Sequence, residues 1–348
     1  MRVNIKLFLL HLLLCLTCIG VTTTARADNP SADNQAAVSS KAADSGEGNN
    51  GAIYIGEQRC VACHKNEIDH YLHTTHSKAF KSNPKNELER RGCEACHGPG
   101  SKHAENFMSK NALASFTRES AKPGESAKAG IKLGLTRESG KTPDQLNEPC
   151  LQCHKGGQRI FWNFSTHQSK GVACTDCHNT MAKFSQTGLL KKASITETCY
   201  TCHQQQRSEF LKRSHMPLPE GKMSCEDCHN PHGSATKPLL KADSVNQLCY
   251  SCHAEKRGPF LWEHAPVKES CLNCHKPHGS NHEKLLSTPR PFLCQQCHSN
   301  QAHVNNLTTK ANTGSGKAPD ERVIGRSCST CHAQVHGSNH PSGVRLHR

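Results

Sequence analysis

Ten copies of the motif Cys-x-x-Cys-His account for twenty of the twenty-two cysteines in this 348-residue chain. Two thiols at this spacing add to the vinyl groups of haem, and the His that follows gives the haem iron one axial nitrogen. A zinc ribbon needs no His directly after its second Cys, and a disulfide framework needs no fixed spacing. The complete and repeated motif therefore predicts ten covalently bound haem c groups.

The motifs come in five pairs. The first motifs of the pairs begin at Cys60, Cys150, Cys199, Cys249 and Cys294, and the second motifs begin at Cys93, Cys174, Cys225, Cys271 and Cys328. The second thiols for covalent attachment are those of Cys63, Cys96, Cys153, Cys177, Cys202, Cys228, Cys252, Cys274, Cys297 and Cys331. The proximal iron ligands are predicted to be His64, His97, His154, His178, His203, His229, His253, His275, His298 and His332.

Other histidines recur at matched offsets from these motifs, which predicts that they are the distal iron ligands. Those that follow first motifs are His76, His167, His215 and His264, and those that follow second motifs are His103, His232 and His278. In the last pair we expect His303, His336 and His340 to act in this role. Four histidines fit no offset and are interpreted as bystanders, namely His70, His73, His282 and His347.

Met181 lies three residues after His178, where the sister units have His232 and His278. A thioether is a competent axial ligand that raises haem potential relative to imidazole. We therefore expect Met181 to be the distal ligand of the iron whose proximal ligand is His178. Two alternatives stay open: Met181 fills a packing gap, or a His of the last unit or His282 serves that iron.

The N-terminus predicts export. A basic start and a short apolar run precede Ala25-Arg26-Ala27, a small-x-small cleavage site. The polar, Gly-rich residues that follow are typical of a flexible leader. From the first motif on, pairs recur every 45 to 51 residues in the middle of the chain, as in an array of similar units. The predicted parts are a signal peptide (1–27), a leader (28–56) and a decahaem domain (57–348) of paired units 57–103, 148–181, 197–232, 247–282 and 292–340.

Composition favours a fold built around cofactor. Hydrophobic residues make up 34% and aromatic residues 5% of the chain, which is too little for an ordinary core. We expect a multihaem cytochrome c: an extended chain, mostly loops and short α-helices that wrap a linear haem array, with little or no sheet. The net charge of +14 would elsewhere suggest nucleic acid, but haem propionates account for the basic residues, so no nucleic-acid partner is expected.

The stretches CYSCHAEKRGPFLWEHAPV (249–267), PHGS (277–280), LCQQCH (293–298) and RSCSTCHAQVHGSNHPSG (326–343) resemble the MtrA-like periplasmic decahaem cytochromes of outer-membrane porin–cytochrome conduits. The resemblance covers the chain from about residue 58 onward. It implies a haem array in the periplasm, associated with or inserted through the outer membrane. It also implies three kinds of partner: an outer-membrane β-barrel porin, periplasmic or inner-membrane cytochromes and an outer-surface cytochrome.

Three functions are compatible with these motifs: an electron conduit to extracellular iron, a freely diffusing periplasmic shuttle, and a multihaem oxidoreductase. An enzyme needs an iron open to substrate, whereas the histidines suffice to give every iron two ligands. The conduit is therefore favoured over an enzyme, although direct Fe(II) oxidation at a haem is compatible with it. A higher potential at a Met181-ligated haem favours inward flow from Fe(II); outward metal reduction is the alternative.

Overall fold

The computed structural model describes residues 51–108, 135, 137–298 and 327–347. The chain divides into two compact units, Met1–Ala42 and Ala43–Arg348, and every described residue lies in the second. The expected signal peptide therefore lies outside the described residues, and so does the expected leader up to residue 50.

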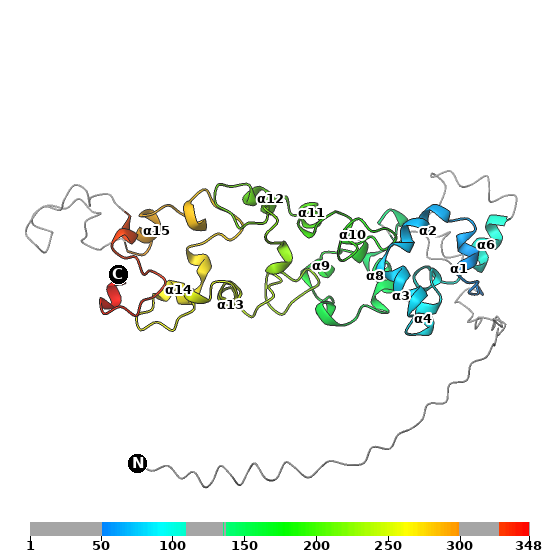
Figure 1. Cartoon of the computed structure of the whole chain (residues 1–348), viewed down its shortest axis with the longest axis horizontal. Helices are drawn as coiled ribbons and strands as arrows, with labels where there is room; N and C mark the ends of the chain where they lie inside the picture. The colour runs from blue at the N-terminus through cyan, green and yellow to red at the C-terminus, as the bar shows by residue number, and fades with distance from the viewer. Residues whose placement is uncertain (1–50, 109–134, 136, 299–326, 348) are drawn as a thin grey trace, which may run out of the picture. The chain divides into compact units, whose positions relative to one another are not determined.

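Short helices joined by loops form the described part of the unit from Ala43 to Arg348 (Figure 1). The α-helices are α1 (Glu57–Val61), α2 (Lys65–Leu72), α3 (Thr75–Ser82), α4 (Glu87–Arg90), α5 (Glu94–His97), α6 (Ser101–Met108), α8 (Pro143–Leu151), α9 (Thr166–Ser169), α10 (Cys174–Cys177), α11 (Ile195–Tyr200), α12 (Gln204–Phe210), α13 (Val245–Tyr250), α14 (Ala265–Glu269) and α15 (Phe292–Gln295). The 3₁₀ helices are η2 (Arg137–Ser139), η3 (Gly157–Arg159), η4 (Cys225–Asp227), η5 (Ala254–Lys256), η6 (Cys271–Asn273), η7 (Glu283–Leu285), η9 (Cys328–Thr330) and η10 (Gly343–Arg345).

Backbone pairing across this unit is limited to isolated bridges, and the described ranges contain no β-strand. Three of the bridges have the same form: His178, His229 and His275, each the last residue of a second motif, pair with Leu190, Leu240 and Leu286. The predicted class, mostly loops and short helices with little or no sheet, is confirmed.

Side-chain caps place several first motifs at the end of a helix. Ser194 accepts a hydrogen bond from the backbone N–H of Glu197 at the start of α11 (3.1 Å), and Ser244 caps α13 in the same way. Thr142 begins α8 with a complete capping box. Each of these helices ends inside or just after the first Cys of its motif, so the second Cys and the His follow in a turn.

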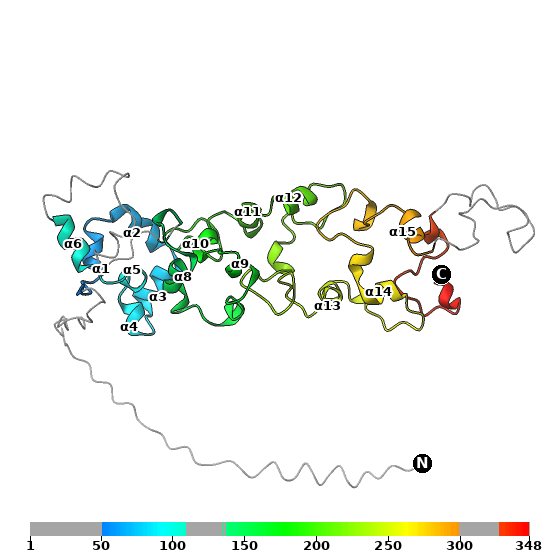
Figure 2. The same cartoon turned by 180° about the vertical axis from the view of Figure 1, so that it is seen from behind.

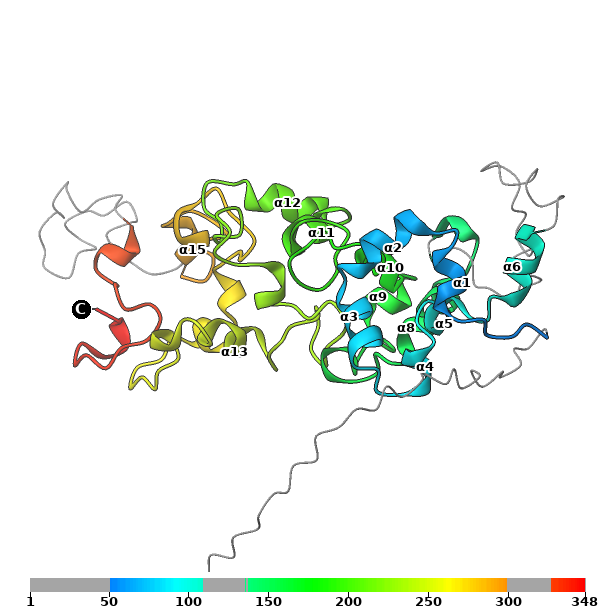
Figure 3. The same cartoon turned by 45° about the vertical axis from the view of Figure 1, so that its right-hand side comes forward.

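Neighbouring motifs are brought together by contacts between these helices. α8 lies against both α5 and α10, and α11 lies against α12, as the views from behind and from the side also show (Figure 2, Figure 3). α5, α8 and α10 each contain a motif cysteine, so three consecutive motifs meet around α8.

Polypeptide packing alone gives the unit a sparse core. Leu146, Phe210 and Trp162 are buried, with exposed fractions of 1%, 5% and 7%, whereas Phe164 is 97% exposed and Leu211 77% exposed. Such apolar side chains suit packing against porphyrin better than contact with water. No helix within the described ranges is long and apolar enough to cross a bilayer.

Candidate functional site

Every one of the ten motifs closes the same backbone turn. The N–H of the motif His donates to the carbonyl of the first Cys, with N···O distances of 2.9 to 3.1 Å in all ten. This bond has the i to i−4 register of one α-helical turn. The two cysteines and the His of each motif therefore belong to one short, rigid segment.

Within each pair, the thiols of the first cysteines of the two motifs lie close enough to shift each other's pKa. The coupled thiols are those of Cys60 and Cys93, Cys150 and Cys174, Cys199 and Cys225, Cys249 and Cys271, and Cys294 and Cys328. The thiol of Cys199 lowers the pKa of Cys225 to about 7, because it stabilises that thiolate. Both attachment sites of a pair thus lie side by side.

Successive pairs are also neighbours, through the second cysteines of their motifs. Burial and the nearby charges of Cys150 and Cys153 raise the pKa of Cys96 to about 11. The same relationship recurs at the three following boundaries, where Cys177 faces Cys202, Cys228 faces Cys252, and Cys274 faces Cys297. The ten motifs therefore adjoin one another in chain order.

The histidines of second motifs face histidines from the following unit. His178 lies opposite His232, with ring centroids 6.0 Å apart and planes at 14°. His229 lies opposite His278 at 6.2 Å. In the same arrangement His275 lies opposite His336 at 6.2 Å. In each case the partner follows the second motif of the next unit along the chain, so the two facing histidines belong to different units.

The histidines of first motifs face histidines from the preceding unit. The ring-centroid distances are 5.8 Å for His154 and His76, 6.1 Å for His203 and His167, and 6.3 Å for His298 and His264. His64 has no preceding unit, and its partner at 6.2 Å is His103 from its own pair.

These distances fit an iron between the two rings. Two imidazoles on opposite faces of one iron hold their centroids about 6 Å apart, because each metal–nitrogen bond is about 2 Å and each centroid lies about 1 Å behind its nitrogen. The Nε2 atoms of His76 and His154 face each other at 3.5 Å. The donor set therefore matches bis-histidine haem ligation at these seven motifs.

Hydrogen bonds fix the ring tautomer that such ligation needs. The Nδ1–H groups of His178, His229 and His275 donate to the carbonyl oxygens of Gly188, Pro238 and Lys284, at 2.6, 2.9 and 2.8 Å. A second-shell acceptor of this kind leaves Nε2 unprotonated and orients it toward a metal. Burial acts in the same direction, since it lowers the pKa of His232 to about 4 and keeps that ring neutral.

The last unit differs from the sequence interpretation. The ring of His332 lies 4.5 Å from that of His347, a residue that was interpreted as a bystander. His340 accepts from the backbone N–H of Ser342 (3.2 Å), and no contact between it and a motif His is seen in the described ranges. His303 lies outside the described residues.

Two expected ligands are not brought to their irons in the way the sequence suggested. The Nε2–H of His215 donates to a carboxylate oxygen of Glu220 at 3.0 Å, and the ring is not paired with a motif His in the described part of the chain. Met181 was expected opposite His178, but the ring in that place is His232. The sequence offsets identified most of the histidines that pair, but they did not show that the pairs cross between units.

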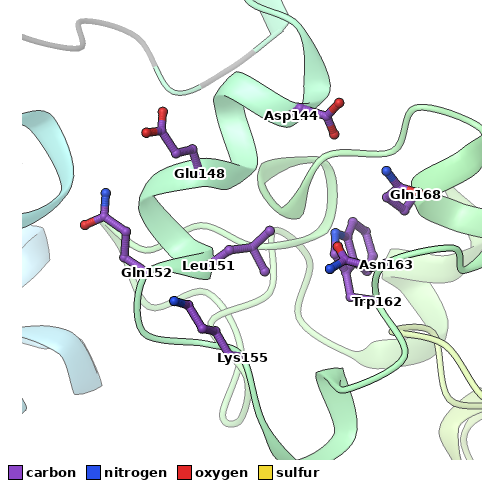
Figure 4. Close-up of a pocket in the computed structure, with 8 residues that line it drawn as sticks. All are labelled: Asp144, Glu148, Leu151, Gln152, Lys155, Trp162, Asn163 and Gln168. Carbon is purple, nitrogen blue, oxygen red and sulfur yellow. The ribbon is translucent and has the colours of Figure 1, made fainter.

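A cavity of about 350 Å³ lies beside α8 and contains none of these ligands (Figure 4). Its walls are Asp144, Glu148, Leu151, Gln152, Lys155, Trp162, Asn163 and Gln168. Because no His or Cys lines it, the cavity supplies no axial ligand, and the histidine pairs are the chemically competent sites.

Comparisons with known proteins agree with this architecture. A model of the doubled CXXCH motif matches residues 167–208, 215–258 and 264–303, and a model described as cytochrome c554 and c-prime matches residues 92–179. The chain is 39% identical over 299 residues to the multiheme cytochrome MtrA of Shewanella baltica (strain OS185), which covers 84% of this chain and 81% of that protein. The ten motifs, their paired histidines and this similarity place the chain in the MtrA-like family of multihaem c-type cytochromes, which bind haem covalently.

Proposed function

We propose that this protein is a decahaem electron conduit that links the periplasm to extracellular iron. The observation that carries the proposal is the unbroken adjacency of the ten motifs in chain order, together with histidine pairs that cross every described boundary between middle units. When bound, the haem irons supply one-electron oxidation and reduction. The chain supplies two ligands to each iron and holds neighbouring groups side by side.

The proposed count of ten haems rests on the identical backbone geometry of the ten motifs. All ten motifs share the same turn. In the proposed scheme, first motifs after the first pair take their distal ligand from the preceding unit, and second motifs before the last pair take theirs from the following unit. The two remaining irons, those of His64 and His332, take His103 and His347 from their own pairs. By this scheme His215 serves the iron of His253. Two ligands on every iron leave no position for substrate, which supports electron transfer over an enzymatic reaction.

The proposed place is the periplasm, with the array inserted through the outer membrane inside a porin. In a chain of loops and short helices, many backbone N–H and C=O groups have no hydrogen-bond partner within a helix or sheet. A backbone of this kind can cross the hydrocarbon core of a membrane only when other protein encloses it. The cytochrome would exchange electrons with periplasmic or inner-membrane cytochromes on one side. On the other side it would meet Fe(II) directly or through an outer-surface cytochrome, with inward flow as the proposed direction.

Two measurements test this function. The mass of the exported protein should exceed that of residues 28–348 by ten haem groups; fewer additions would contradict the decahaem proposal. Liposomes that contain the cytochrome with its porin, an internal redox dye and an external iron couple should show electron flow across the membrane. Flow with porin alone, or none with both proteins, would contradict the conduit, and a cytochrome that purifies without any porin would favour the periplasmic shuttle.

A further inference from the structure

Met181 occupies the same backbone frame as the ligand His232. The N–H of Met181 donates to the side chain of Asn179 at 3.0 Å, and the N–H of His232 donates to Asn230 at 3.2 Å. Each asparagine directly follows the His of a second motif. The turn that carries His232 away from its own motif is therefore present at Met181 as well.

Two further backbone contacts are the same in both turns. Asn179 N–H donates to the carbonyl of Leu189 (2.7 Å), and Asn230 N–H donates to that of Leu239 (2.8 Å). The bridges from His178 to Leu190 and from His229 to Leu240 complete the match. Met181 thus stands in a ligand position by structure as well as by sequence offset.

The structure also shows which iron this position serves. His232 faces His178, and His278 faces His229. Both partners lie three residues after the His of a second motif, and each faces the His of the second motif in the preceding pair. A residue at this position therefore serves the second iron of the preceding pair. His336, four residues after its own motif His, obeys the same direction by facing His275. By the same rule Met181 serves the iron of the second motif in the preceding pair, which ends at His97.

The spacing of the motifs supports this register. The ring of His76 faces that of His154 across the boundary between the first two pairs (5.8 Å), in the same way that His167 faces His203 and His264 faces His298 at later boundaries. α5, which ends at His97, contacts α8, and α8 contacts α10, which ends just before His178. The boundary between the first and second pairs thus repeats the relationship at later boundaries, where the ligand crosses.

We propose that the thioether of Met181 is the sixth ligand of the iron held by the motif that ends at His97. The assignment replaces the expectation that Met181 serves the iron of His178, whose distal position belongs to His232. It rests on the proposed decahaem function, and it gives the protein one His/Met haem, the second in chain order. Met181 is half-buried and is not part of the small apolar core, which suits a side chain that reaches toward a haem iron.

Spectroscopy of the oxidised holoprotein tests the ligand. His/Met ferric haem has a far-red charge-transfer band that bis-histidine haem lacks, and thioether ligation raises the potential. The wild type should show this band with the amplitude of a single haem. Met181→Leu should abolish it, and Met181→His should abolish it while lowering the highest of the stepwise reduction potentials. Met223→Leu is the matched control, since Met223 is also half-buried and should leave the band unchanged.

An experimental structure of the holoprotein tests the iron. The sulfur of Met181 should lie at bonding distance from the iron attached through Cys93 and Cys96. Absence of the band in wild type, persistence of the band in Met181→Leu, or a sulfur bound to the iron of His178 would each overturn the proposal. The liposome assay separates this outcome from the proposed function: electron flow without the band contradicts the ligand alone, and the band without flow contradicts the conduit alone.

Discussion

The rings of His178 and His232 stack 6.0 Å apart at an angle of 14°, although the two residues belong to different repeat units. Under the proposed ligation, the iron attached at Cys174 and Cys177 takes its distal ligand from a residue that lies 54 residues further along the chain than its proximal His. Local offsets alone would have given that iron to a residue of its own unit.

Replacing His232 should open the iron of His178 and no other. His232→Ala should create a high-spin haem, because the stacked ring is removed and no second His is paired with that position in the described residues. Carbon monoxide binding by the reduced protein measures the number of open irons, and the variant should gain a single binding site. Unchanged low-spin spectra would contradict the cross-unit pairing.

The last iron should depend on His347. His347→Ala should open the haem of His332 and add a single carbon monoxide site, because His347 is the ring next to His332. At 4.5 Å the two rings contact each other directly, so they would have to separate by roughly 1.5 Å to hold an iron between them. His340→Ala is the control from the same unit and should add none, because that ring accepts a hydrogen bond from the Ser342 backbone. The reverse result would restore His340 as the ligand and make His347 a bystander.

Glu94 should hold the first unit together. This carboxylate is only 2% exposed and accepts hydrogen bonds from the backbone N–H groups of Ile55, Gly56 and Gly100, the latter two at 2.8 Å each. Glu94→Ala leaves these buried donors unpaired, at about 1–3 kcal/mol for each group that water does not reach. Hydrogen exchange at Ile55 and Gly56 should accelerate by tenfold or more.

Glu87→Ala is the control for that measurement. Glu87 pairs with Arg90 at 3.1 Å on the surface, where the side chains are 81% and 59% exposed. An exposed pair of this kind contributes about 0–1 kcal/mol, so exchange at Ile55 should stay at its wild-type rate. Equal acceleration in both variants would show that Glu94 has no special role.

Haem attachment should be required for a stable fold. Few large apolar side chains are buried by polypeptide alone, and several are exposed, Phe164 almost fully. The mature chain produced without haem attachment should have low helicity and should be digested by protease far faster than the holoprotein. A protease-resistant, helical apoprotein would contradict this expectation.

The sequence predicted the motifs and the class of fold because both are local. A Cys-x-x-Cys-His turn closes through one backbone bond, and short capped helices follow from residues such as Ser194 and Thr142. The pairing of ligands was not predictable in this way. Which ring faces His178 depends on how α10 and the turn at His232 are placed by packing, and an offset within one unit carries no record of that contact.

Reciprocal exchange of ligands also bears on how such a protein changes length. Under the proposed ligation, each middle unit gives one ligand backward and one forward, while the first and last of the five pairs each use one ligand of their own. Duplication of one internal segment of 45 to 51 residues would therefore add two complete centres and leave the ligands of the neighbouring pairs in place. Insertion of a whole unit between existing units thus preserves the proposed ligation.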